Sequence, residues 1–316
     1  MESVICKKDK NMKVVPAVWW EQVVCNLCGR DEGEPYHRER LPYFDEMLDF
    51  QIVRCRHCGL VYTNPRLADH NVAYLLGSSD NPEEIERHGQ AKAAVFVGAL
   101  DEIERLQQRS GNKTGGKLLD VGCGSGHFLA AARKRGFEVC GIEPACVSAN
   151  YGVEKFGLEV IGKNILDVDL PAESFDVITA WDVIEHVADP QAVLERCADW
   201  LRPGGIMALR FPSATWQKIK AVILHQLLAG RRWVFGPTIH LYFFTEQTFT
   251  QIGQNVGLEV LRTKTTAAEA NTNSAVLDQV KLASNMVIRG IEMVSGRHLG
   301  NLEVYCCKRE GNLQNE

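Results

Sequence analysis

The sequence has no long apolar run, and this absence is the first constraint on the protein. Its 316 residues include no stretch of about 20 apolar residues, the length that crosses a bilayer as a helix. Residues 1–15, MESVICKKDKNMKVV, carry lysines but no continuous apolar core that leads to a small-residue cleavage site. We therefore expect neither a membrane span nor a secretory signal, and we expect a cytoplasmic protein.

An excess of positive charge is also absent. The chain has 35 lysines and arginines against 40 aspartates and glutamates, which gives a formal net charge of -5. Non-specific affinity for nucleic acid depends on many contacts between basic side chains and phosphates. The charge balance therefore argues against nucleic acid as a partner, although a local basic patch is compatible with it. No internal repeat or low-complexity tract is present, and the oligomeric state cannot be inferred.

Two common phosphate-binding loops are missing, although a glycine-rich loop is present. Gly122, Gly124 and Gly126 alternate with other residues directly after the strand-like residues 117–121. The dinucleotide-binding pattern Gly-x-Gly-x-x-Gly would need its third glycine where His127 stands, and no Gly-Lys-Ser/Thr follows. The loop therefore predicts close approach of the backbone to another ligand, with a plain strand–helix turn as the alternative.

Short apolar runs alternate with amphipathic segments from residue 117 onward. Strands are predicted at 117–121, 137–142, 158–162, 175–181 and 206–211, and helices at 126–135, 146–156 and 190–201. A further helix is expected at 245–256, a strand at 258–265, a long helix near 275–294 and a last strand at 301–308. This alternation predicts an α/β fold with a doubly wound, Rossmann-like, mostly parallel sheet. Ligands of such sheets bind outside the carboxyl ends of the strands.

Four of the eleven cysteines form two Cys-x-x-Cys-Gly sequences, Cys25 to Gly29 and Cys55 to Gly59. Cys25, Cys28, Cys55 and Cys58 can supply four thiolates to a closed tetrahedral zinc site, which has a structural role. An iron centre, two redox dithiols and free thiols are the alternatives. A short segment with little core of its own needs such a cross-link, so we expect a small N-terminal zinc-binding module.

The residues around the glycine loop resemble those of class I S-adenosylmethionine-dependent methyltransferases. Asp120 to Gly126, DVGCGSG, is similar to motif I of that family, and WDVIEHVADP and the turn LRPGG at 201–205 are typical as well. The resemblance covers about residues 117–308 and implies S-adenosylmethionine as cofactor. It also implies the cofactor-binding residues, which are Asp120, Gly122, Cys123, Gly124, Gly126, Glu143, Pro144, Asn164, Ile165 and Asp182.

The resemblance also implies which part of the cofactor several of these residues contact. Asp120 faces the cationic methionine end, Glu143 accepts hydrogen bonds from the ribose hydroxyls, and Asn164 and Ile165 contact the adenine. A carboxylate has enough lone pairs to accept from both hydroxyls of one ribose. From the residues alone, Glu143 could instead be a solvated acid at the end of a strand, and Asp167 is a weaker candidate near the adenine.

The N-terminal segment has a resemblance of its own. Cys58 to Pro65, CGLVYTNP, is similar to the end of a zinc-ribbon segment in bacterial methyltransferases associated with sugar and polysaccharide modification. This implies a sugar or a nucleotide-linked sugar as acceptor. Deoxysugar C-methyltransferases have a richer Tyr-His-Glu-His segment than the one around His240, which argues against C-methylation. Two other functions are the alternatives. One is an RNA methyltransferase that uses the zinc module for substrate binding, and the other is a non-catalytic S-adenosylmethionine-binding interaction protein.

Three residues are candidates for catalysis. His186 follows the fourth predicted strand, and His240 and Tyr242 lie in the run IHLYFFT. A base is needed only if the acceptor loses a proton as it attacks. Packing is the alternative for each of them.

These patterns divide the chain into four parts. Residues 1–20 are expected to be flexible, 21–65 to form the zinc-ribbon-like module, 66–116 to be a helical linker with helix from about 82 to 108, and 117–316 to form the methyltransferase domain. A lid insertion is expected at about 213–240. Its basic amphipathic helix, 216–233, could also be a membrane-surface helix or a partner-binding face.

Overall fold

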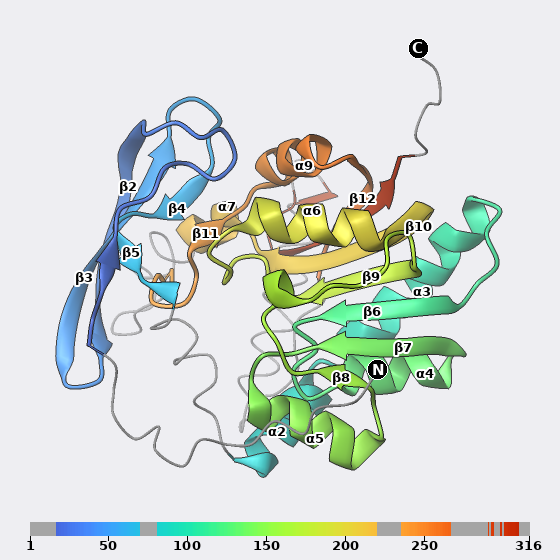
Figure 1. Cartoon of the computed structure of the whole chain (residues 1–316). Helices are drawn as coiled ribbons and strands as arrows, with labels where there is room; N and C mark the ends of the chain where they lie inside the picture. Colours follow the sequence, from blue (N-terminus) through green and yellow to red (C-terminus); the bar gives the residue numbers. More distant parts are fainter. Residues whose placement is uncertain are drawn as a thin grey trace.

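We describe a computed structural model of the chain, shown in Figure 1. The structure describes residues 17–69, 81–219, 235–266, 290, 292–293, 298 and 300–309. A β-rich N-terminal part lies beside a larger part that is built around a twisted sheet with helices on both sides (Figure 1). The expected helix near 275–294 and most of the expected lid helix at 216–233 fall outside the described residues.

The central sheet has seven strands in the order β12-β13-β10-β9-β6-β7-β8. These strands are β6 (Gly116–Val121), β7 (Phe137–Ile142), β8 (Val160–Ile161), β9 (Phe175–Trp181), β10 (Leu201–Pro212), β12 (Leu258–Thr265) and β13 (Asn301–Lys308). Five strands pair in parallel, and β13 runs antiparallel to both β10 and β12. The predicted α/β, doubly wound, mostly parallel fold is confirmed. The chain reverses its direction of winding between β6 and β9, which is where such sheets bind ligands.

Adjacent residues of each strand face opposite sides of the sheet. Leu118 packs in a cluster with helices α3 (Ala93–Arg109), α4 (His127–Lys134) and α5 (Cys146–Phe156), whereas Leu119 packs in a cluster with α6 (Pro190–Trp200) and α9 (Glu246–Asn255). The strands are therefore apolar on both faces, as buried parallel strands are.

Local signals in the sequence fix where these helices begin. The Asp189 side chain accepts a hydrogen bond from the Ala192 backbone N–H at the start of α6, and Pro190 occupies the first turn. At α9, Thr245 and Thr248 form a reciprocal capping box. The caps fix where the segments before α6 and α9 end, and candidate site residues lie in these two segments.

The N-terminal part is held together by a four-stranded sheet of order β11-β4-β3-β2. The strands are β2 (Gly33–Tyr43), β3 (Glu46–Cys55), β4 (Val61–Thr63) and β11 (Tyr242–Phe243), while β1 (Trp20–Glu21) pairs with β5 (Arg66–Leu67). The β11 strand comes from a segment about 180 residues further along the chain. The zinc-ribbon-like module expected at 21–65 is therefore completed by residues outside that range.

The segment expected to be a helical linker differs from that expectation in two ways. It starts with strand β5, and its helix is interrupted at Lys92 between α2 (Pro82–Ala91) and α3. Asn81 caps α2 by accepting a hydrogen bond from the Glu83 backbone N–H. Both helices pack against α4 and so lie beside the glycine loop that precedes it.

The expected lid begins with α7 (Ala214–Ile219), after which residues 220–234 are not described. The short run 236–241 then leads into β11. In the described part of the chain, no helix combines the length and apolarity that a membrane crossing requires.

Candidate active site and metal centre

The glycine loop follows β6 and leads into α4. The backbone N–H groups of Gly122 and Cys123 both donate to the carbonyl of Ile142, at 2.8 and 3.1 Å, which ties the loop to the neighbouring strand. Gly122 and Gly124 have φ angles of +65° and +52°. A Cβ on Gly122 would lie 2.5 Å from Cγ2 of Val183, whereas a Cβ on Gly124 would have no atom within 4 Å. Gly124 therefore faces open space, where a ligand can approach the backbone.

Glu143 directly follows strand β7, and its side chain points toward the glycine loop. Its Oε2 accepts a 2.8 Å hydrogen bond from the Gly124 backbone N–H, and its Oε1 accepts one of 2.8 Å from the Ala145 N–H. Burial raises the pKa of Glu143, against these two hydrogen bonds. The carboxylate is thus fixed at the loop, with lone pairs left over for a ligand's hydroxyl groups.

Asp120 is the acidic residue near the end of β6, and it is only 1% exposed. Its Oδ1 accepts a 2.6 Å hydrogen bond from Oγ1 of Thr179 on β9. Burial raises the pKa of Asp120 to about 8, with a contribution from Glu143 and against the effects of Thr179 and Lys92. The environment therefore favours a cationic ligand group that would compensate the charged form.

Asp120 and the glycine loop open into a pocket of about 130 Å³. Other walls come from α2, α3 and the end of β9; the lining residues are His88, Gly89, Lys92, Phe96, Asp120, Gly122, Cys123, Gly124, Ser125, His127, Phe128 and Trp181. Of these, only Asp120, Gly122, Cys123 and Gly124 were predicted as site residues. The Cys123 thiol is buried against the backbone, since a Cβ on Gly141 would lie 2.5 Å from it.

Asp182 lies directly after β9 and has a φ angle of +57°. Its Oδ2 accepts a 2.7 Å bond from Nζ of Lys92, and its Oδ1 lies 3.0 Å from Nε of Arg210. Burial alone would raise the pKa of Asp182, but the two cations hold it below its ordinary value. Asp182 thereby joins the pocket wall at Lys92 to the segment that continues to His186.

The predicted adenine-side residues lie at the end of β8. The Asn164 side chain accepts a 3.1 Å hydrogen bond from the Leu166 backbone N–H, and so caps the short helix η1 (Ile165–Asp167). Ile165 is buried against the sheet, and Pro144 is exposed directly after Glu143. These residues do not line the described pocket, so their contact with a ligand stays a prediction.

The two predicted catalytic histidines lie together although 54 positions separate them. The ring centroids of His186 and His240 are 4.9 Å apart. Burial, followed by the nearby His240, lowers the pKa of His186 to about 4, so its imidazole is neutral near pH 7. Glu185 is buried beside them, and the ligand atoms of all three residues lie within 4.8 Å of one another. Glu185 was not predicted; its position next to His186 in the sequence was the available signal.

Tyr242 does not fit the catalytic role that was predicted for it. The residue is 2% exposed and belongs to β11. Its hydroxyl donates to the Ala188 carbonyl at 3.0 Å and accepts a 2.9 Å bond from the Arg66 guanidinium. Burial raises the pKa of Tyr242 to about 12. Tyr242 lies on the two-residue strand β11, which pairs with β4 of the N-terminal sheet, and its hydroxyl bonds to the segment before α6. These are the surroundings of a packing residue between the two parts of the chain.

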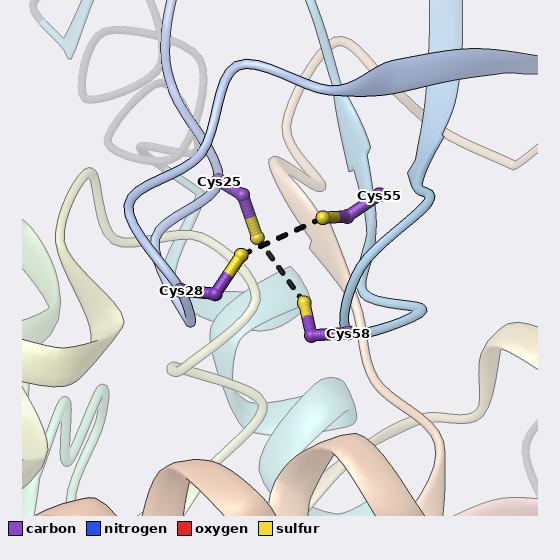
Figure 2. Close-up of side chains that lie close together, drawn as sticks. All are labelled: Cys25, Cys28, Cys55 and Cys58. Atoms are coloured by element: carbon purple, nitrogen blue, oxygen red, sulfur yellow. Dashed lines mark hydrogen bonds between the residues drawn. The ribbon is translucent and has the colours of Figure 1, made fainter.

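The four predicted metal ligands converge from two tight turns (Figure 2). Cys25 and Cys58 have their sulfur atoms 3.4 Å apart, and Cys28 and Cys55 have theirs 3.6 Å apart. All four are free thiols within 4.8 Å of one another. Thiolates at about 2.3 Å from a tetrahedral zinc ion would be about 3.8 Å apart. The geometry and the donor set therefore fit zinc.

The cysteine-bearing module contacts the histidine segment directly. Thr63 of β4 donates through its backbone N–H to the Leu241 carbonyl at 2.9 Å, and through Oγ1 to the His240 carbonyl at 3.1 Å. Asn26, between two of the cysteines, donates a 2.8 Å bond to Asp189 at the end of the His186 segment. The module thus holds both segments that carry the histidines.

Comparison with known proteins shows the family of the chain. A family model described as a methyltransferase domain matches residues 87–263, which is more than half of the chain. A ubiquinone biosynthesis O-methyltransferase of Rhodopseudomonas palustris strain TIE-1 is 33% identical over 130 residues, 40% of this chain and 51% of that protein. That of strain BisA53 is 30% identical over 172 residues, 53% of this chain and 68% of that protein. The chain thus spans about half the length of some curated relatives it matches.

Among solved structures, the magnesium protoporphyrin IX methyltransferase of Synechocystis PCC 6803 with bound SAH aligns with a TM-score of 0.51 and 13% identity. The alignment covers 75% of this chain and 100% of that one, and it supports the fold. From the family model and the relatives, the chain belongs to the class I S-adenosylmethionine-dependent methyltransferase domain family.

Proposed function

We propose that this protein transfers the methyl group of S-adenosylmethionine to an oxygen atom of a small molecule. The observation that carries the proposal is the bond between Gly124 and Glu143, which holds a carboxylate against a glycine that faces open space. A ligand that brings hydroxyl groups to Glu143 and a cationic group to Asp120 would satisfy both buried acids.

We assign the cofactor to these residues as follows. Glu143 would accept hydrogen bonds from the ribose hydroxyls through its remaining lone pairs. Asp120 would compensate the charge of the methionine ammonium group, and the loop from Gly122 to Gly126 would contact the cofactor through its backbone. The cofactor supplies an electrophilic methyl group on a sulfonium. Asn164 and Ile165 would border the adenine, as the family resemblance implies, and Pro144 would belong to the same cofactor site.

The acceptor side is proposed to lie at His186 and His240. Asp182 links them to the pocket wall, since it contacts Lys92 and its charge raises the pKa of His186 against the larger effect of burial. A neutral imidazole can hold a hydroxyl group and take its proton. Because transfer from a sulfonium is an in-line displacement, positioning of the acceptor by these side chains accounts for much of the rate.

The proposed class of acceptor rests on two separate similarities, one to the curated relatives and one of the N-terminal cysteine segment. The curated relatives are named as O-methyltransferases of ubiquinone biosynthesis, which favours a hydroxyl group of an intermediate of that biosynthesis. The N-terminal cysteine segment favours a sugar or a nucleotide-linked sugar. Both are small molecules with a hydroxyl group, and both are compatible with the acidic balance of the chain.

The four cysteines are proposed to hold one zinc ion with a structural role. A Cys₄ set closes the coordination sphere and leaves no position for a substrate. By fixing β4, the ion would fix the hydrogen bonds from Thr63 to the segment of His240.

A transfer assay tests the function. The purified full chain is incubated with methyl-labelled S-adenosylmethionine and with, in separate reactions, a mixture of phenols, a mixture of nucleotide sugars, and total RNA. Label in either small-molecule reaction supports the proposal and identifies the acceptor class. Label in RNA alone, or turnover that is absent despite bound cofactor and a broad acceptor mixture, would overturn it.

A further inference from the structure

The indole N–H of Trp181 is an unsatisfied donor in the wall of the pocket beside the glycine loop. Trp181 is the last residue of β9, it is 7% exposed, and it lines the same pocket as Asp120. Among the residues that the structure describes, none accepts a hydrogen bond from its Nε1. A buried donor without a partner costs free energy, so this N–H indicates an acceptor that a ligand brings.

Two phenylalanines hold the Trp181 ring in place. The ring centroid of Phe128 on α4 lies 5.0 Å from that of Trp181, and the ring centroid of Phe96 on α3 lies 6.3 Å from it. Both phenylalanines are buried. Because these contacts fix the orientation of the indole, its N–H is a preorganised donor.

A cation lies in the same pocket wall. Lys92 stands between α2 and α3, and its Nζ donates a 2.7 Å hydrogen bond to Oδ2 of Asp182. Asp182 has a second cation beside it, since Nε of Arg210 lies 3.0 Å from its Oδ1. A lysine ammonium has three N–H donors. Lys92 can therefore keep its bond to Asp182 and donate to a ligand at the same time.

The other polar side chains of this wall are less suited to a buried anionic group. Oγ of Ser125 and Nδ1 of His127 lie 2.8 Å apart and bond to each other, and His88 is exposed to solvent. Lys92 and Trp181 are therefore the donors that the described wall offers to an anionic group away from solvent.

We propose that Lys92 and Trp181 bind the carboxylate at the methionine end of the cofactor. They acquire this role only together with the proposed function, in which Asp120 takes the ammonium group at the same carbon atom. A pocket that binds one of these two groups must provide for the other. An acid, a cation and a fixed N–H donor in one pocket fit such a zwitterion, and hydrogen bonds to a carboxylate are stronger than those between neutral groups.

The two residues then select the intact cofactor against the same nucleoside without its carboxylate. A site that is built to hydrogen-bond a group rejects an analogue that lacks the group, because buried polar atoms of the site stay unpaired. Here the analogue would leave the Trp181 N–H without an acceptor, as it is in the free protein.

Calorimetry with two ligands tests the assignment. The full-length protein is titrated with S-adenosylhomocysteine, the demethylated cofactor, and with its decarboxylated analogue, in which a hydrogen atom replaces the carboxylate. The wild-type protein should bind S-adenosylhomocysteine at least about tenfold more tightly, because hydrogen bonds to a charged group contribute that much.

Two conservative variants separate the carboxylate contact from packing. Trp181→Phe keeps an aromatic ring and removes the N–H, and Lys92→Met keeps the aliphatic chain and removes the charge. Each should reduce the preference for S-adenosylhomocysteine at least about threefold, while the affinity for the decarboxylated analogue stays within about twofold of wild type. Trp20→Phe and Lys117→Met, at exposed residues outside the pocket, are the matched controls and should keep the full preference.

Binding of the decarboxylated analogue shows that each variant is folded. Equal affinities of the wild-type protein for the two ligands would overturn the inference alone. The full preference retained in either Trp181→Phe or Lys92→Met, including an equal loss of affinity for both ligands, would overturn it as well. If the wild-type protein binds neither ligand, the proposed function fails too.

Discussion

The backbone N–H of Gly124 donates a 2.8 Å hydrogen bond to Oε2 of Glu143, a residue 19 positions further along the chain. This bond joins the turn after β6 to the residue that follows β7, and β6 is also one of the two strands, β6 and β9, between which the sheet changes its direction of winding. The bond holds together the glycine loop and the strand-end acid, the two features from which the sequence predicts cofactor binding.

Glu143→Ala should lower the affinity for S-adenosylhomocysteine at least about tenfold. Charged hydrogen bonds contribute about 1.5–3 kcal/mol each, and about 1.4 kcal/mol is a factor of ten. Calorimetry measures the loss, and Glu138→Ala, at an exposed acid on the strand that precedes Glu143, is the control. Equal affinities of Glu143→Ala and wild type would remove Glu143 from the cofactor site.

Gly122→Ala and Gly124→Ala should separate stability from binding. Both glycines have positive φ, which costs a residue with Cβ about 1–3 kcal/mol. Only the Gly122 variant also forces its Cβ against Val183, so it should lose more stability in denaturant unfolding. Gly124→Ala should instead lose more cofactor affinity relative to its stability. The opposite order would show that the open side of the loop is not the ligand side.

Binding of S-adenosylmethionine should strengthen as the pH rises from 6 to 7.5. Asp120 has a pKa of about 8 in the free protein, so it is largely protonated at pH 6. The ligand's ammonium group, with an ordinary pKa of about 7.7–8.0, favours the ionised form. Binding therefore releases a proton in this window. Asp120→Asn should bind more weakly at pH 7.5 and show a flatter profile; parallel profiles would contradict the pairing.

The same group predicts a change in stability with pH. The pKa of Asp120 is raised in the folded state, from 3.8 to about 8. Its contribution to the free energy of unfolding is therefore fully present below about pH 4 and is lost as the pH rises through 8. The difference in stability between Asp120→Asn and wild type should grow in favour of the variant between pH 5 and 8, measured by urea unfolding at each pH. No change in that difference would contradict the burial of Asp120.

Cys25→Ser should release zinc and lower turnover more than cofactor affinity. The module contacts His240 and Leu241 through Thr63, whereas the cofactor pocket is formed by other segments. Metal analysis, thermal unfolding and cofactor titration measure the three effects. Cys307→Ser, at a half-buried free thiol on β13, is the matched control. A metal-free wild-type protein of equal stability would refute the structural role of zinc.

The sheet and the glycine loop could be predicted because their signals are local. Strands such as β6 are short, apolar on both faces and followed by glycines, and helices such as α6 begin at recognisable caps. The Cys-x-x-Cys spacing likewise indicated four ligands in two turns. In each case a few consecutive residues carry enough information, whatever packs around them.

The remaining parts depend on contacts between distant segments. Strand β11 has two residues, too few for a periodic pattern, so its pairing with β4 could not be predicted. For Tyr242 the sequence left both a catalytic and a packing role open. The amphipathic pattern of α2 and α3 shows that one face is buried but does not show which surface covers it. For that reason Lys92 and Phe96 were not expected in the pocket wall.

Direct binding of S-adenosylmethionine to the wild-type protein tests the central claim. Equilibrium dialysis with the labelled cofactor gives both the stoichiometry and the dissociation constant. The account predicts saturable binding of one molecule per chain at concentrations below about 1 mM, the upper end of usual enzyme–substrate values, and displacement by S-adenosylhomocysteine. A folded protein that shows no saturable binding in that range would contradict it.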